Sequence, residues 1–147
     1  METHIGQALE KSRRNITEII VHCTATHAGR GVSVSDIDCW HRQRGFNGIG
    51  YHYVVSLDGR IGQGRPVHLA GAHCKGHNSN SIGVVYVGGL DTNGRAADTR
   101  TAAQRKALAE LLGNLRKLYP GAAIHGHRDF AAKDCPCFDA TKEYATL

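Results

Sequence analysis

The most reactive stretch of the chain is the segment GHRDFAAKDCPCFDA, residues 126–140. It contains an imidazole (His127), an amine (Lys133) and a thiol (Cys135). Its glycine, proline and aspartates indicate irregular backbone rather than the interior of a helix or strand. A helix would carry residues eight apart to opposite faces, whereas a loop can curl until His127 and Cys135 meet. We therefore expect a loop that brings these two side chains to one point.

An imidazole nitrogen and a thiolate sulfur form a ligand pair that suits zinc. Two protein ligands do not hold zinc firmly, so a third must come from elsewhere in the chain. The best candidate is His22, which lies far upstream in the sequence IIVHCTAT. The pattern predicts an open Zn²⁺ site formed by His22, His127 and Cys135, with Tyr51 and Lys133 beside it.

Three protein ligands are typical of a catalytic zinc, which keeps a further position for water. Zinc lowers the pKa of such a water from about 15.7 to roughly 7. A site of this kind can hydrolyse amides, and a nearby lysine and tyrosine can stabilise the oxyanion and assist proton movement. No C-x2-C pair accompanies the site, which disfavours a zinc finger. The ten histidines of the chain still leave other trios open at this point.

Other residues could form a second metal site or support the metal ligands. His73, Cys74 and His77 could hold a second metal on a helix, but the surrounding glycines and asparagines favour a loop. His125 could hydrogen-bond a metal ligand, and so could Asp129.

The elements that must position these residues follow from hydrophobic periodicity. Strands are predicted over residues 17–23, 51–56, 60–64, 82–87 and 122–126, and helices over residues 34–44, after Thr101 and after Asp139. Ser33 and Thr101 are the expected N-caps of the two longer helices. His22 then falls at the carboxyl end of a buried strand, a usual place for a functional group in an open sheet. The fold class is α/β, one domain with a central mixed sheet flanked by helices.

Length and composition agree with one domain. The 147 residues divide into a polar N-terminal arm, residues 1–15, and a single domain, residues 16–147. Residues 5–13 form either a short helix or part of a loose arm. The chain lacks an apolar run of about eighteen residues and the apolar centre of a secretory signal. We therefore expect no membrane span and a cytoplasmic location without a signal peptide.

Cysteine count and charge exclude other classes. Five cysteines, an odd number, argue against a disulfide framework, and Cys23 and Cys39 are expected to be buried. The net charge of +5 comes from scattered basic residues without an arginine-rich tract, which disfavours nucleic acid as a partner. A mild positive field would also favour anionic polymers such as bacterial cell wall.

Four motifs occur in the order of a known family. They are VHCTAT, GYHYVVSLDGRIGQGRP, GAHCKGHNSNSIGVVYVGG and GHRDFAAKDCPCFD. Together they cover roughly residues 16–140, and they resemble the zinc-dependent N-acetylmuramoyl-L-alanine amidases of phage lysozyme type (amidase type 2). Those enzymes are related to the peptidoglycan recognition proteins. The resemblance implies that fold, and hydrolysis of the amide between N-acetylmuramic acid and L-alanine in bacterial peptidoglycan.

The resemblance also assigns residues. It implies that His22, His127 and Cys135 are the metal ligands and that Tyr51 and Lys133 are catalytic. It places the loop containing His73 along the substrate cleft, so His73 is a candidate substrate contact. Cys137 departs from the expected pattern and could compete as a ligand, although the spacing from His127 and the nearby lysine favour Cys135.

Two further functions remain open. One is a peptidoglycan-binding module without catalysis, which the retained Cys135 disfavours. The other is a protein partner bound through the N-terminal arm, because some phage members of the family inhibit an RNA polymerase. We expect a monomer that acts as a phage or prophage endolysin and reaches the cell wall after release from the cytoplasm.

Overall fold

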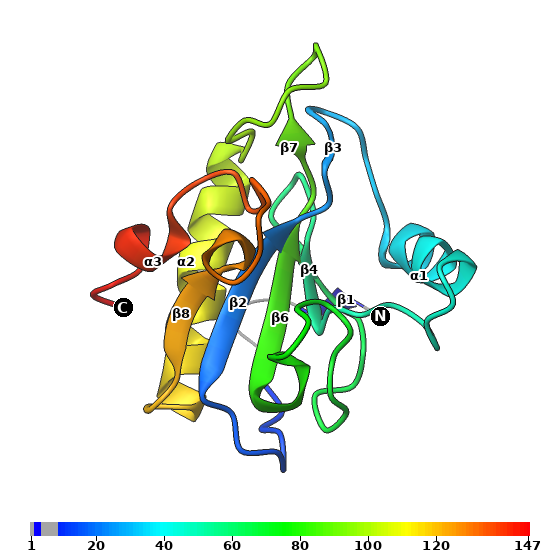
Figure 1. Ribbon diagram of the computed structural model, residues 1–147. Coiled ribbons are helices and arrows are strands. Elements are labelled where there is room, and N and C mark those ends of the chain that lie inside the picture. Colours follow the sequence, from blue (N-terminus) through cyan, green and yellow to red (C-terminus); the bar gives the residue numbers. More distant parts are fainter. Residues whose placement is uncertain (1, 4–8) are drawn as a thin grey trace.

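The fold is built on a mixed sheet of six strands. The computed structural model describes residues 2–3 and 9–147. The sheet has the order β1-β5-β4-β6-β2-β8 (Figure 1). Its strands are β1 (Glu2–Thr3), β2 (Glu18–Cys23), β4 (Tyr53–Val55), β5 (Ile61–Gln63), β6 (Ser81–Tyr86) and β8 (Ala123–Gly126). The neighbours β4, β6, β2 and β8 run parallel, and β5 is antiparallel to both β4 and β1.

Three α-helices and two 3₁₀ turns accompany this sheet within the described residues. They are α1 (Val34–Gln43), α2 (Ala102–Leu118), α3 (Ala140–Glu143), η1 (Asn78–Asn80) and η2 (His127–Asp129). Ser33 and Thr101 cap α1 and α2 through capping boxes with Asp36 and Gln104, as their sequences predict. Among the described residues, no helix combines the length and apolarity that a bilayer crossing requires.

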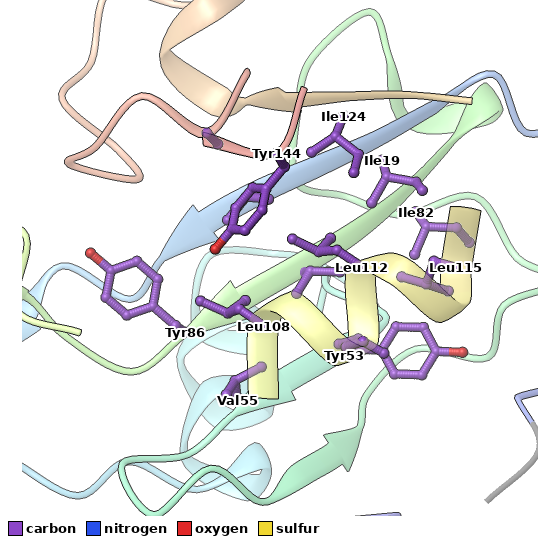
Figure 2. Packing of buried hydrophobic residues seen from close by; sticks show 14 of the residues in the cluster. Ile19, Tyr53, Val55, Ile82, Tyr86, Leu108, Leu112, Leu115, Ile124 and Tyr144 are labelled. Atoms are coloured by element: carbon purple, nitrogen blue, oxygen red, sulfur yellow. The ribbon is translucent and has the colours of Figure 1, made fainter. Parts of the chain in front are cut away.

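The two faces of the sheet pack against different helices. Alternate side chains of a strand point to opposite faces, so Ile19 and Val21 of β2 join the core under α2, which lies behind the sheet in Figure 1. Figure 2 shows Leu108, Leu112 and Leu115 of α2 within this core. Val54 and Val85 point the other way and pack with Ile37 of α1. His22 follows Val21 and therefore lies on the α1 side of the sheet.

The N-terminal segment is attached to the domain at residues 2–3, which pair with β5, and again from Leu9 onward. The backbone N–H of Ser12 donates to the Tyr119 hydroxyl at 2.7 Å. The Arg14 guanidinium donates to the carbonyls of Val67 at 2.9 Å and Ser81 at 3.1 Å. Residues 9–13 are not helical, and the rest of the expected helix lies outside the described residues. A loose arm over residues 1–15 is therefore wrong for the described residues of that stretch that contact the domain, among them residues 2–3, 10 and 12–14.

Two other sequence expectations are corrected. Cys39 is exposed rather than buried, because Ile37 and His41 occupy the buried stripe of α1 and Cys39 lies about 200° around the helix from Ile37. A second sheet, β3 (Thr26–His27) paired with β7 (Gly89–Leu90), lies where loops were expected. Strands this short have no periodicity that a sequence could reveal.

A buried arginine fastens the C-terminal segment to the domain. The Arg100 side chain is 1% exposed, and it forms paired hydrogen bonds with the carboxylates of Asp98 and Glu143 at 2.7–2.9 Å. Its guanidinium also lies 3.4 Å from the centre of the Phe138 ring. Phe138 belongs to the core under α2. Arg100 thus anchors the end of the loop that contains Cys135.

Arg100→Met should destabilise the protein by about 3 kcal/mol. Removing one partner of a buried ion pair typically costs about 3–5 kcal/mol, and the partly exposed carboxylates place this case at the lower end. Urea unfolding would measure the loss. Arg105→Met is the matched control, because Arg105 also pairs with Asp98 but is 50% exposed, and such pairs contribute at most about 1 kcal/mol. Equal losses in the two variants would contradict an anchoring role for Arg100.

Candidate metal centre

Two neighbouring parallel strands place the two predicted histidine ligands side by side. In the register of β2 and β8, Val21 lies opposite Gly126. His22 follows Val21 and His127 follows Gly126. The centres of the two imidazole rings are 4.6 Å apart. Both side chains are at least nine-tenths buried. The sheet therefore brings together residues that are far apart in the sequence, as parallel strands with a common end can do.

The loop after β8 brings the thiol of Cys135 to the same place. In Figure 1 this orange segment curls over the upper end of β2. The Cys135 sulfur accepts a hydrogen bond from the backbone N–H of Cys23 at 3.2 Å, and it lies 3.9 Å from Nδ1 of His22. The Tyr86 hydroxyl donates to the carbonyl of Pro136 at 2.7 Å and holds the next residue. One ligand atom from each of His22, His127 and Cys135 lies within 4.8 Å of the other two.

The surroundings favour the ionisation states that bind metal. Burial lowers the pKa of His22 and of His127, and the positive charge of Lys133 acts in the same direction on both. Hydrogen bonding from the Cys23 side chain lowers the pKa of Cys135. Metal ligands must be neutral imidazoles and ionised thiols. Two histidines and one cysteine are a donor set that fits zinc.

Tyr51 lies against the histidine ligand from β2. Its ring centre is 5.0 Å from that of His22 and 5.2 Å from that of His41. His41 holds the adjacent backbone, because its Nδ1 accepts a hydrogen bond from the N–H of Gly50 at 2.8 Å. Burial raises the pKa of Tyr51. The phenol therefore keeps its proton and can act as a hydrogen-bond donor at neutral pH.

Comparisons with known proteins identify the family of the chain. The sequence profile of the family described as N-acetylmuramoyl-L-alanine amidase matches residues 12–138. The chain belongs to that family. The endolysin of Klebsiella phage KP32 is 42% identical over 127 residues, which cover 86% of this chain and 84% of the relative.

Solved structures extend the match to the fold. The N-acetylmuramoyl-L-alanine amidase LysC from Clostridium intestinale superposes with a TM-score of 0.76 at 29% identity, covering 92% of this chain and 87% of LysC. Drosophila PGRP-LB superposes with a TM-score of 0.75 at 25% identity, covering 94% of this chain and 84% of its own. These findings confirm the predicted family, the predicted fold and the predicted enzyme class. The chain is a peptidoglycan amidase.

Lys133 of the amidase lies within electrostatic reach of the three ligand residues. It is exposed and belongs to the same loop as Cys135. Its charge contributes to the lowered pKa values of His22, His127 and Cys135. An exposed ammonium beside a buried donor set can face a substrate that approaches from solvent. The catalytic assignment of Lys133 stays a prediction.

His73 of the amidase faces inward. Its Nδ1 lies 2.8 Å from Nε2 of His22, and its Nε2 lies 3.1 Å from the hydroxyl of Ser81. The residue is 9% exposed, and burial lowers its pKa to about 3. Both ring nitrogens thus have partners inside the protein. The substrate contact that the sequence suggested stays untested, and this geometry favours a structural task.

The rival ligands Cys137 and His77 have other partners. The Cys137 sulfur contacts the carbonyl of Gly89 at 3.4 Å and lies 3.9 Å from the sulfur of Cys23. His77 pairs with Glu18 at 2.7 Å. Within the described part of the chain, His22, His127 and Cys135 are the only group of three or more such donors close enough to hold one ion. The structure therefore gives no support to a second metal site around His73 and His77.

The other polar candidates serve the loop itself. Asp129 accepts from the N–H of Gly126 and lies 3.3 Å from Nδ1 of His125. The sequence indicates only a core residue at Cys23, yet the backbone N–H and the thiol of Cys23 both act on Cys135. Its position directly after the histidine at a strand end is a signal that could have suggested this role.

Proposed function

We propose that this amidase is a zinc enzyme in which His22, His127 and Cys135 hold the ion. The observation that carries the proposal is the convergence of three suitable donor atoms within 4.8 Å of one another. When bound, zinc would polarise the substrate carbonyl and activate water. The proposed substrate bond is the amide between the lactyl group of N-acetylmuramic acid and the L-alanine of the stem peptide.

The residues around the ligands have separate tasks in this proposal. The Tyr51 phenol is protonated at neutral pH, and burial raises its pKa further, so it donates a hydrogen bond to the carbonyl oxygen as negative charge develops there. The Lys133 ammonium adds positive charge at the exposed side of the same site. It also donates a proton to the departing amine in this proposal. Neither residue is needed to hold the metal.

We further propose that the enzyme serves as a phage or prophage endolysin. The 42% identity to a phage endolysin across most of both chains supports this role. The proposed site of action is the bacterial cell wall. A protein partner for the N-terminal arm stays a prediction, and residues 4–8 of that arm lie outside the described residues.

Digestion of purified sacculi tests the proposed reaction. Mass spectrometry should detect free stem peptides that begin with L-alanine, together with glycan strands whose lactyl carboxyl groups are free. A strong zinc chelator should stop the release, and added Zn²⁺ should restore it. Cleavage at glycosidic or peptide bonds would refute the substrate assignment. Full activity of protein shown by elemental analysis to be metal-free would refute the zinc assignment.

A further inference from the structure

A chain of buried polar side chains leads away from the metal centre. It starts at Nε2 of His22, passes through the two ring nitrogens of His73 and ends at the hydroxyl of Ser81. His22 is 1% exposed, His73 is 9% exposed and Ser81 is fully buried. Burying a polar group without a hydrogen-bond partner costs free energy. Each of these three side chains therefore depends on its neighbour for a hydrogen bond.

The fold is shaped around the imidazole of His73. A Cβ atom on Gly83 would lie 2.6 Å from Cδ2 of His73, and a Cβ atom on Gly71 would overlap the same atom. Only glycine at these two positions leaves room for the ring. The side-chain oxygen of Asn78 also accepts hydrogen bonds from the backbone N–H groups of His73 and Cys74, both at 2.9 Å. The position of the ring is therefore fixed from several sides.

The geometry decides which nitrogen of each ring carries a proton. Nδ1 of His22 faces the Cys135 sulfur at 3.9 Å, so Nδ1 is the nitrogen that can bind the ion. The proton of a neutral His22 then resides on Nε2, and this N–H donates to Nδ1 of His73. His73 must accordingly carry its own proton on Nε2, which donates to the Ser81 hydroxyl.

We propose that His73 is a positioning residue that holds His22 in the ring orientation and tautomer required for metal binding through Nδ1. The inference rests on the proposed zinc centre and extends it to a residue outside the three proposed ligands. Partners of this kind orient metal-bound histidines, and their loss typically weakens metal affinity about 10–100-fold.

Two substitutions of nearly equal shape test the role of His73. In His73→Asn, the side-chain oxygen takes the place of Nδ1 and can still accept the hydrogen bond from His22. His73→Leu has a similar shape and no acceptor. Competition of Zn²⁺ with a chromophoric chelator should show affinity in His73→Leu reduced about 10–100-fold. His73→Asn should stay within about threefold of the unsubstituted protein.

The results separate this inference from the proposed function. Equal zinc affinity in His73→Leu and the unsubstituted protein would overturn the positioning role alone. Equal losses in both variants would also overturn it, since the acceptor would then be irrelevant. Absence of zinc binding by the unsubstituted protein would instead refute the zinc centre itself.

Nitrogen-15 NMR of the zinc-loaded, unsubstituted enzyme tests the same point without any variant. It should show His22 bound to zinc through Nδ1 and protonated at Nε2. Zinc bound through Nε2 of His22 would overturn the inference, whether or not the substituted proteins fold.

Discussion

Cys135→Ser should remove bound zinc and amidase activity together. A serine hydroxyl does not ionise near neutral pH. Hydrogen bonding from Cys23, in contrast, lowers the pKa of the Cys135 thiol, which favours the thiolate that binds metal. The two histidines that remain do not hold zinc firmly. Loss of the ion removes several kcal/mol of transition-state stabilisation, so release of stem peptides should fall about 10³-fold or more. Elemental analysis and the sacculus assay would measure both effects.

Cys137→Ser is the matched control for this experiment. Cys137 lies in the same loop, but its sulfur contacts the carbonyl of Gly89 and the sulfur of Cys23 rather than the histidine ligands. The Cys137→Ser protein should keep its zinc and nearly all its activity. The reverse pattern, with full activity in Cys135→Ser and loss in Cys137→Ser, would show that the wrong thiol has been assigned.

Much of the site could be predicted because its parts depend on local sequence patterns. The β-branched run before His22 indicates a buried strand, and β2 spans Glu18–Cys23, one residue shorter than the expected strand over residues 17–23. The strand after the long helix ends just before His127. The carboxyl ends of parallel strands lie at one edge of a sheet, and the family resemblance named His22 and His127 together as ligands. Each step needed only periodicity, turn residues and family resemblance.

Other features of the site could not be predicted from local patterns. The contact between His73 and His22 depends on how a long loop folds across the sheet, and the glycines around it indicated only a loop. The Arg100 cluster joins residues from three separate segments. The local sequence around a charged residue in a polar stretch does not indicate whether its side chain is buried or exposed to solvent. Long-range contacts of this kind follow from tertiary packing rather than from propensity.

Lys133→Ala should slow hydrolysis about 10²–10³-fold while zinc stays bound. The expectation treats Lys133 as a single group that stabilises the developing oxyanion, which typically contributes about 2.7–4 kcal/mol. Lys133 is exposed, so its removal should leave the free energy of unfolding almost unchanged. The loss should appear in kcat rather than in substrate affinity, because the interaction strengthens as charge develops on the carbonyl oxygen.

Two further variants show whether position and charge of this lysine matter. Lys142→Ala removes an exposed lysine from α3, and it should leave turnover unchanged. Lys133→Arg keeps the positive charge, so it should recover part of the rate if electrostatic stabilisation is the main contribution. Full turnover in Lys133→Ala would remove Lys133 from the mechanism. Loss of zinc from that variant would show that the ammonium acts on the ligands, because its charge already contributes to the lowered pKa of Cys135.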